Sequence, residues 1–485
     1  MILNVLVASF FMPRVVINYF LTYFVCTLFA TAQWFHRKFN TVEVDQFQYH
    51  LELSTQNVIK ADATLINNAI KNCLLAPLVY ALLFLFLIFI AEKALKKLSY
   101  QIPLTASLLS PVSLVISIVV GVIYFLHLNI ELANPFVENK DWVAHYYAEP
   151  KVISTPSKKR NLVLIYAESM ESTLASLYPN DYLFDALSFK NYKPVSFNSF
   201  TQLTDTGWTI AGMTASQCGV PLKPLGIFNE NKIGELTTKF MPNAKCLGDV
   251  LKDNGYTNVF IGGASRKYSG KLSFLKTHGY EESYGRSQFK KMNPAIAMND
   301  WGVNDDELFK FAKEKYLKLK AEKKPFNLTL LTIGMHFPDG YLSPSCPSKY
   351  NDYRDSILCT SFLVKNFVDF VKTNEGNTGT DIVIVGDHLT MKSSIAKSLE
   401  KQTDRSIFNL FISRDHDERP NRKDINHFDL FPTILTQLNF HLKDGRGGLG
   451  CSGFDKVSCS SITSVEQIND KLHKHSTFYE SLWAQ

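Results

Sequence analysis

Residues 161–168 read NLVLIYAE, and this stretch sets the class of fold. The run is almost continuously apolar and rich in branched side chains, which is typical of a strand buried on both faces of a sheet. Glu168 follows the strand. Residues 381–388 read DIVIVGDH and predict a second buried strand, followed by Asp387 and His388. Because catalytic groups of α/β sheets gather at the carboxyl ends of strands, we expect these three side chains to lie at one edge.

The chain from residue 161 onward continues this alternation of strands and helices. Residues 258–262 and 326–334 are further strand candidates, and residues 305–324 predict a helix. That helix starts with acidic residues and ends with lysines, which suits its dipole. The alternation predicts an α/β fold in which a parallel or mixed sheet is sandwiched by helices.

A third stretch, residues 200–221, reads FTQLTDTGWTIAGMTASQCGVP and is expected to hold Thr209 at a helix N-terminus. Free backbone N–H groups and the helix dipole favour an anion there. A threonine hydroxyl is a weak nucleophile and needs a base or a metal ion to lose its proton. Together with Thr209, the residues Glu168, Asp387 and His388 would form a mixed oxygen and nitrogen site suited to Zn²⁺ or Mn²⁺. Each alone is more often structural, so the prediction rests on the joint pattern.

Five segments in this order resemble the phosphoglycerol transferases of the alkaline phosphatase and sulfatase superfamily. The likeness is strongest to the membrane-bound enzyme that decorates osmoregulated periplasmic glucans, and lipoteichoic acid synthases and lipid A phosphoethanolamine transferases are more distant. It covers residues 161–454. The segments are NLVLIYAESME, TGWTIAGMTASQCGVPL, GMHFPDG, IVIVGDH and HFDLFPTIL.

The resemblance implies a function and a set of residue roles. Thr209 would be the nucleophile that carries a covalent phospho-intermediate, with Glu168, Asp387 and His388 holding Mn²⁺ or Zn²⁺, and Mg²⁺ as a further candidate. His336 matches a histidine that contacts the transferred phosphate. The expected donor is a phospholipid, with phosphatidylglycerol favoured, and the expected acceptor is a cell-envelope glycan.

Three alternatives stay open at the level of the sequence. A phosphoethanolamine transferase would share the site, and a non-catalytic membrane sensor would share the fold, although a sensor has no chemical need for all four candidate ligands. A hydrolytic sulfatase fits less well, because sulfatases convert a cysteine or serine to formylglycine and Thr209 cannot be converted.

The substrate pocket is expected to include basic and aromatic side chains. Lipoteichoic acid synthases carry a histidine, a tryptophan and an arginine where this chain has Gly262, Ser269 and Lys271, so that binding mode does not carry over intact. Lys271 keeps the charge without the bidentate geometry of a guanidinium. The candidates for substrate binding are His336, Lys271, Trp208, Arg266 and Trp301. The loop lysine and arginine could equally belong to a solvated face, and the tryptophans could simply pack.

Residues 1–130 differ in composition from the rest of the chain and are expected to form a membrane region. Residues 15–34, 73–91 and 108–128 are apolar runs close to the about 20 residues needed to cross a bilayer. Three lysines in residues 92–101 place that loop in the cytoplasm, although basic residues 36–38 oppose this orientation. Residues 42–71 are either an interfacial helix or a connecting loop, and residues 1–14 either extend the first span or belong to another.

The remaining chain divides into a linker, residues 131–160, and a catalytic domain, residues 161–485, placed on the periplasmic side of the inner membrane. Six cysteines follow residue 200, an even number that suits an oxidising compartment. Nearest-neighbour pairing is the preferred connectivity, and a zinc cluster is the alternative. The pairs would be Cys218 with Cys246, Cys346 with Cys359, and Cys451 with Cys459.

Overall composition excludes one class of function. The 485 residues carry a formal charge of +6 and are 46% hydrophobic, which is enough for one large domain and a membrane anchor. Acidic and basic residues are interspersed, with no dense basic stripe. We therefore expect no nucleic acid as a partner, whereas the resemblance implies a membrane, a lipid and a glycan.

Overall fold

A computed structural model describes residues 19–36, 42–43, 67–97, 111–131, 141–223, 239–337, 339–391, 395–399, 401–413, 422–455 and 465–484. The chain divides into two compact units, one of residues 1–44 and 63–132 and the other of residues 45–62 and 133–485.

The first unit contains helices at all three apolar runs of the sequence. They are a helix over residues 19–36, a π-turn at Ile70–Leu75 that continues into α4 (Ala76–Lys97), and α5 (Pro111–Asn129). Short strands β1 (Val42–Glu43) and β2 (Ile130–Glu131) pair in parallel. Within the portions that the structure describes, none of these helices combines the length and the apolar character that crossing a bilayer requires. The predictions for residues 1–14 and for most of residues 42–71 lie outside the described residues.

The second unit is built on a six-stranded sheet in the order β10-β9-β4-β8-β6-β7. All neighbouring strands are parallel except the edge pair β10 and β9, so the sheet is mixed, as the sequence predicts. Its strands are β4 (Asn161–Ala167), β6 (Thr257–Gly262), β7 (Tyr280–Tyr284), β8 (Phe326–Leu331), β9 (Thr380–Gly386) and β10 (Asn409–Ile412).

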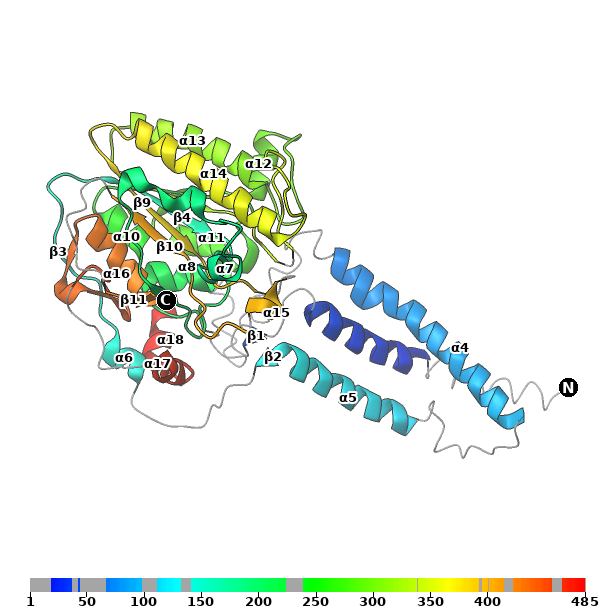
Figure 1. The fold of residues 1–485 in the computed structure, drawn as a ribbon. Coiled ribbons are helices and arrows are strands. Elements are labelled where there is room, and N and C mark those ends of the chain that lie inside the picture. The colour runs from blue at the N-terminus through cyan, green and yellow to red at the C-terminus, as the bar shows by residue number, and fades with distance from the viewer. Residues whose placement is uncertain are drawn as a thin grey trace. The chain divides into compact units, whose positions relative to one another are not determined.

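Both faces of this sheet are covered, because alternate residues of a strand point to opposite sides. Leu162, Leu164 and Tyr166 of β4 join one apolar core, and Val163 and Ile165 join another. The first core is completed by helices α8 (Thr209–Cys218), α10 (Leu247–Asp253), α11 (Lys271–Thr277) and α16 (His427–Gln437). The second is completed by α13 (Asp305–Ala321) and α14 (Tyr353–Asn374), which lie together over the sheet in Figure 1. The sandwich of helices around the sheet is thus confirmed.

Smaller elements surround this sandwich. The short strand pairs are β3 (Val152–Ser154) with β12 (His441–Leu442), β5 (Ser199–Thr201) with β11 (Asp424–Asn426), and β13 (Arg446–Gly447) with β14 (Gly450–Cys451). The remaining α-helices are α6 (Trp142–Tyr146), α7 (Thr173–Leu177), α12 (Arg286–Met292), α15 (Ala396–Leu399), α17 (Val465–Leu472) and α18 (Thr477–Trp483).

Two of the predicted disulfides are present. Cys218, the last residue of α8, is bonded to Cys246, and Cys346 is bonded to Cys359 on α14. Cys451 is also disulfide-bonded, and its predicted partner, Cys459, lies outside the described residues. The first bridge joins the end of α8 to the residue before α10, and the second joins the segment after β8 to α14.

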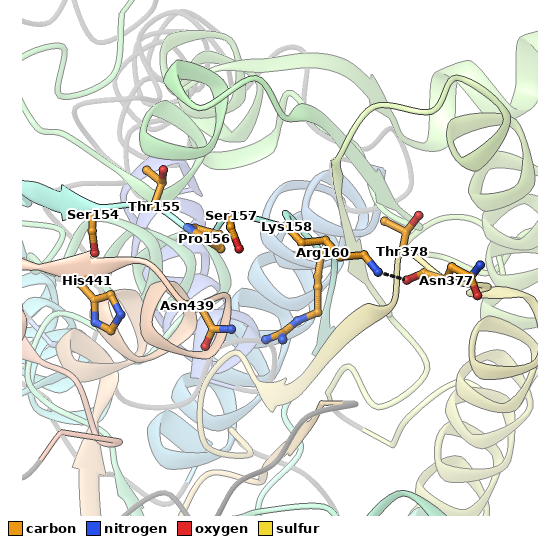
Figure 2. A pocket seen from close by; sticks show the side chains of 10 residues that line it. All are labelled: Ser154, Thr155, Pro156, Ser157, Lys158, Arg160, Asn377, Thr378, Asn439 and His441. Atoms are coloured by element: carbon orange, nitrogen blue, oxygen red, sulfur yellow. Dashed lines mark hydrogen bonds between the residues drawn. The ribbon is translucent and has the colours of Figure 1, made fainter.

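A polar cavity of about 710 Å³ lies at the opposite, amino edge of the sheet. Figure 2 shows its lining, in which the Lys158 ammonium donates to the backbone oxygen of Asn377 at 2.6 Å. Arg160, which immediately precedes β4, lies at this cavity and pairs with buried Asp381. A strand of seven residues separates this edge from Glu168, or about 23 Å at about 3.3 Å per residue.

Candidate metal and nucleophile site

Three of the predicted ligands meet at the carboxyl edge because their strands are neighbours. Strand β4 pairs in parallel with β9, and Ala167 lies opposite Gly386. The residues that follow, Glu168 and Asp387, are therefore brought together with His388. All three side chains are buried, and one ligand atom from each lies within 4.8 Å of the others.

Two side chains of this group are oriented by backbone hydrogen bonds through one atom, while a second atom of each has no hydrogen bond. The Asp387 Oδ1 atom accepts from the amides of Ser169 at 2.9 Å and His388 at 3.0 Å, whereas the buried Oδ2 atom has no hydrogen-bond partner. The His388 Nδ1 atom donates to the Leu389 carbonyl at 2.8 Å, and the buried Nε2 atom has no hydrogen-bond partner. A backbone bond at one ring nitrogen is the usual way to orient a metal-ligating histidine.

The spacing of these atoms fits a small cation. His388 Nε2 lies 3.4 Å from Glu168 Oε1 and 3.5 Å from Asp387 Oδ2. Thr209 Oγ1 lies 3.4 Å from Glu168 Oε2. Neighbouring ligands of a tetrahedral Zn²⁺ site with bonds of about 2.1 Å are about 3.4 Å apart. The donor set and its separations are therefore compatible with a divalent metal.

The three buried groups also shift one another's pKa. Burial raises the pKa of Asp387, and the neighbouring Glu168 carboxylate raises it further. Burial also opposes ionisation of Glu168, but His336 and His388 outweigh it and lower the pKa of Glu168. Despite burial, Asp387 and Glu168 raise the pKa of His388 to about 9. A bound divalent cation would favour two carboxylates and a neutral imidazole, which is the ligand form of all three.

Thr209 is the first residue of α8, as the sequence predicts. Trp208 adopts an extended conformation before it and supplies no side-chain cap, so amides of the first turn are available to an anion. Helix α8 lies close to Asp387, because a Cβ atom at Gly212 would fall 2.0 Å from the Asp387 carbonyl oxygen. That oxygen also contacts His427 Nε2 at 2.9 Å.

The predicted substrate residues fall into two groups. His336 follows β8, and its ring stacks on Trp301 with centroids 3.8 Å apart. Lys271 begins α11 with only 4% of its surface exposed, and burial lowers its pKa to about 8 against the opposing pull of Glu168 and Asp387. His336 and Lys271 thus share the electrostatic surroundings of Glu168.

The described contacts of Arg266 and Trp208 are with other parts of the second unit. The Arg266 Nη1 atom donates to the Ser283 carbonyl at 2.9 Å and the Ser283 hydroxyl at 2.7 Å, which ties its guanidinium to β7. Trp208 is 4% exposed and belongs to the apolar core beneath α8.

Several residues that contact the candidate ligands cannot be identified from the residue types in the sequence alone. Ser169 has a positive φ of 55°, donates from Oγ to Glu168 Oε1 at 2.9 Å, and donates from its amide to Asp387. Thr332 Oγ1 accepts from the Glu168 amide at 3.0 Å. The sequence offers a signal for His427, which stands in the family-like segment HFDLFPTIL, but none for its contact with Asp387.

Comparisons with known proteins agree with this geometry. Residues 160–440 match the sulfatase family model. Phosphoglycerol transferase I of Salmonella typhimurium is 35% identical over 334 residues, covering 66% of this chain and 42% of the relative. The Shigella flexneri protein of the same name is 34% identical over 332 residues, with the same coverage. The chain thus spans about two fifths of the length of these curated relatives.

The fold has a counterpart among solved structures. A protein of the alkaline phosphatase superfamily from Vibrio parahaemolyticus superposes with a TM-score of 0.50 at 20% identity, covering 66% of this chain and 76% of that one. Residues 160–440, which match the sulfatase family model, include both strands that precede the candidate ligands and the helix that carries Thr209. The chain therefore belongs to the sulfatase family and is related to phosphoglycerol transferase I.

Proposed function

We propose that this protein transfers a phosphoglycerol group from phosphatidylglycerol to a cell-envelope glycan through a covalent intermediate on Thr209. The observation that supports this most directly is the position of the Thr209 hydroxyl. It stands at an uncapped helix N-terminus, 3.4 Å from a carboxylate of the buried Glu168, Asp387 and His388 group. The similarity to phosphoglycerol transferase I favours this head group.

In this proposal Glu168, Asp387, His388 and Thr209 hold one divalent metal, Mn²⁺ or Zn²⁺, with Mg²⁺ as a further candidate. The donors are three oxygens and one imidazole nitrogen, a set that these ions accept. When bound, the ion lowers the pKa of a coordinated hydroxyl and offsets negative charge on a phosphoryl group. The protein's part is to fix the donors and to exclude water around them.

The reaction proceeds in two displacements at phosphorus. The Thr209 hydroxyl gives up its proton and its oxygen attacks the phosphorus of the lipid; the bond from phosphorus to the diacylglycerol oxygen breaks, and diacylglycerol leaves as an alcohol with one proton taken up. An acceptor hydroxyl then loses its proton and attacks the same phosphorus, the bond from phosphorus to the Thr209 oxygen breaks, and Thr209 takes up a proton and is regenerated. Amides in the first turn of α8 stabilise the phosphoryl oxygens in both steps.

The head group is proposed to bind between Lys271 and the stacked pair of His336 and Trp301. Lys271 supplies a buried positive charge for a phosphoryl oxygen, and His336 contacts the transferred group. A buried cation is a strong partner for an anion because solvent screens it little.

The proposed location is the inner membrane, with several spans in residues 1–130 and the catalytic domain in the periplasm. Apolar side chains of α4 and α5 support it, because Phe86 and Leu87 are 58% and 62% exposed and Ile123 is 59% exposed. Contiguous exposed apolar surface is typical of membrane contact. Two described disulfides in the second unit fit an oxidising compartment. Anchoring brings the active site to a lipid donor.

A donor assay on the detergent-solubilised full chain tests the proposed function. Vesicles of phosphatidylglycerol and, separately, of phosphatidylethanolamine are incubated with the Mn²⁺-loaded protein, and diacylglycerol release is measured. We expect release from phosphatidylglycerol that chelation abolishes and Mn²⁺ restores. Release from phosphatidylethanolamine alone would overturn the head group and favour a phosphoethanolamine transferase. Release from neither lipid by metal-loaded protein would favour a non-catalytic sensor.

A further inference from the structure

Asp305 is a buried carboxylate that the proposed reaction does not use. It is the first residue of α13 and only 1% of its surface is exposed. Its Oδ1 atom accepts from the Ile333 amide and its Oδ2 atom from the Gly334 amide, both at 2.8 Å. Burial raises the pKa of Asp305 to about 7 despite these two donors. Ionising a carboxyl group is costly at a buried position, and groups whose pKa is shifted in this way cluster at functional sites.

The two amides belong to the turn that carries His336. The His336 amide donates to the Ile333 carbonyl at 3.0 Å, so residues 333–336 form a tight turn with Gly334 inside it. A Cβ atom at Gly334 would lie 2.5 Å from Asp305 Oδ2. Glycine is therefore required for the carboxylate to approach this closely.

The same turn is attached to the metal-binding strand on its other side. The Thr332 amide donates to the Tyr166 carbonyl at 3.0 Å, and its hydroxyl accepts from the Glu168 amide at 3.0 Å. Residues 332–334 are thus held between β4 and α13. A shift of Asp305 would move the turn relative to Glu168.

The segment before Asp305 also contacts His336 directly. Trp301 stacks on the His336 ring with centroids 3.8 Å apart and planes inclined by 32°. Asn299 Oδ1 accepts from the amides of Trp301 at 2.9 Å and Gly302 at 3.1 Å, which fixes the backbone that presents this ring. Residues 299–305 therefore hold His336 by its turn and by its ring.

We propose that Asp305 is a positioning residue, which sets the place of His336 in the head-group pocket through the amides of Ile333 and Gly334. This inference rests on the proposed function for its catalytic consequence but not for its structural one. In Asp305→Asn the shape is kept, but an amide –NH₂ group replaces one acceptor and faces a backbone N–H. The turn must then shift, and displacement of a substrate-positioning group by about 1 Å can cost about 100-fold in rate.

Asp355 provides a matched control, because its carboxylate accepts amides from a later part of the segment that follows β8. It is 3% exposed near the start of α14 and accepts from the amides of Lys349 at 2.9 Å, Tyr350 at 2.9 Å and Asn351 at 2.8 Å. Both variants remove a buried carboxylate that accepts loop amides. Only the amides bound by Asp305 lie next to His336 in the chain.

The experiment compares Asp305→Asn and Asp355→Asn in the full chain for diacylglycerol release, bound metal and the rate at which diethyl pyrocarbonate modifies His336, read by peptide mass spectrometry. Asp305→Asn is expected to keep its metal and to lose about 10- to 100-fold in kcat. Its His336 is expected to react faster with diethyl pyrocarbonate. Asp355→Asn is expected to lower Tm while kcat stays within about threefold. Equal loss of kcat in both variants, or unchanged His336 modification in Asp305→Asn, would overturn the proposal.

Gly334→Ala tests the same contact from the other side and serves if Asp305→Asn does not fold. Its Cβ atom would push the turn away from Asp305, so it is expected to reproduce both the loss of kcat and the faster modification of His336. If both single variants fold, their effects in the double variant should not add, because they break one contact. Additive effects would contradict a shared contact. The modification rate needs no turnover, so it separates failure of this inference from failure of the proposed reaction.

Discussion

Lys271 is the residue whose environment most directly limits the pH range of the proposed reaction. Burial lowers its pKa to about 8, and the neighbouring carboxylates only partly restore it. A lysine is protonated below its pKa and neutral above it, so its charge is lost as pH rises through about 8. A divalent metal nearby would lower that value further, because like charges disfavour protonation. The phosphate would then lose one of its cationic partners under mildly alkaline conditions.

The pH profile of kcat/KM with phosphatidylglycerol checks this behaviour. We expect wild-type activity to fall as pH rises through about 8 or slightly below, and Lys271→Arg to move this fall upward because a guanidinium stays charged. Lys271→Ala should lower kcat/KM by about 10- to 100-fold near neutral pH, as expected when a charged hydrogen bond is lost. An alkaline fall that is identical in wild type and Lys271→Arg would show that another group titrates.

For single residues, the sequence predicts the candidate ligands better than it predicts the residues that hold them in place. Glu168, Asp387 and His388 could be proposed to share a site because each follows a buried strand, and the structure brings them together. Ser169 and Asp305 could not, because their contacts depend on the path of the backbone. A positive φ at Ser169 and a turn 28 residues beyond Asp305 leave no local pattern.

Among the elements, α8 is positioned by a missing side chain. Gly212 lets the helix approach the Asp387 carbonyl, where a Cβ atom would fall at 2.0 Å. Backbone atoms cannot yield as a flexible side chain does, so in an alanine variant the helix or the turn that carries Asp387 and His388 must move. The contact couples the element that carries Thr209 to the element that carries Asp387 and His388.

Gly212→Ala is therefore expected to reduce metal affinity as well as stability. Overpacking of this kind costs about 1–3 kcal/mol of unfolding free energy, and the shifted helix should weaken Mn²⁺ binding in equilibrium dialysis. Gly255→Ala is the control, since its Cβ atom would meet nothing within 4 Å although its φ is +81°. That strain costs about 1–2 kcal/mol and should leave metal affinity unchanged. Unchanged affinity in Gly212→Ala would remove α8 packing from the account of the site.

For the whole molecule, the order of elements is predictable but the order of strands is not. Strand and helix periodicity predict the sandwich, and apolar runs coincide with three helices in the first unit. The sheet order β10-β9-β4-β8-β6-β7 depends on contacts between distant residues, which local patterns do not encode. Helix α13 ends at Ala321 rather than at the predicted residue 324, a difference typical of helix ends.

Protease accessibility tests the proposed placement of the chain in the envelope. In spheroplasts, added protease should degrade the second unit while the cytoplasmic face stays protected, and inverted membrane vesicles should show the reverse. The physical reason is that a protease cannot cross a sealed bilayer. Protection in spheroplasts together with degradation in inverted vesicles would place the catalytic unit in the cytoplasm.

Intact mass spectrometry can show whether Thr209 carries the transferred group. The full chain is incubated with phosphatidylglycerol and Mn²⁺ without an acceptor, beside phosphatidylethanolamine and the Thr209→Ala variant. We expect an adduct with the mass of phosphoglycerol, mapped to Thr209 and absent from Thr209→Ala. An adduct that persists in Thr209→Ala would contradict this expectation, as would turnover of phosphatidylglycerol by that variant.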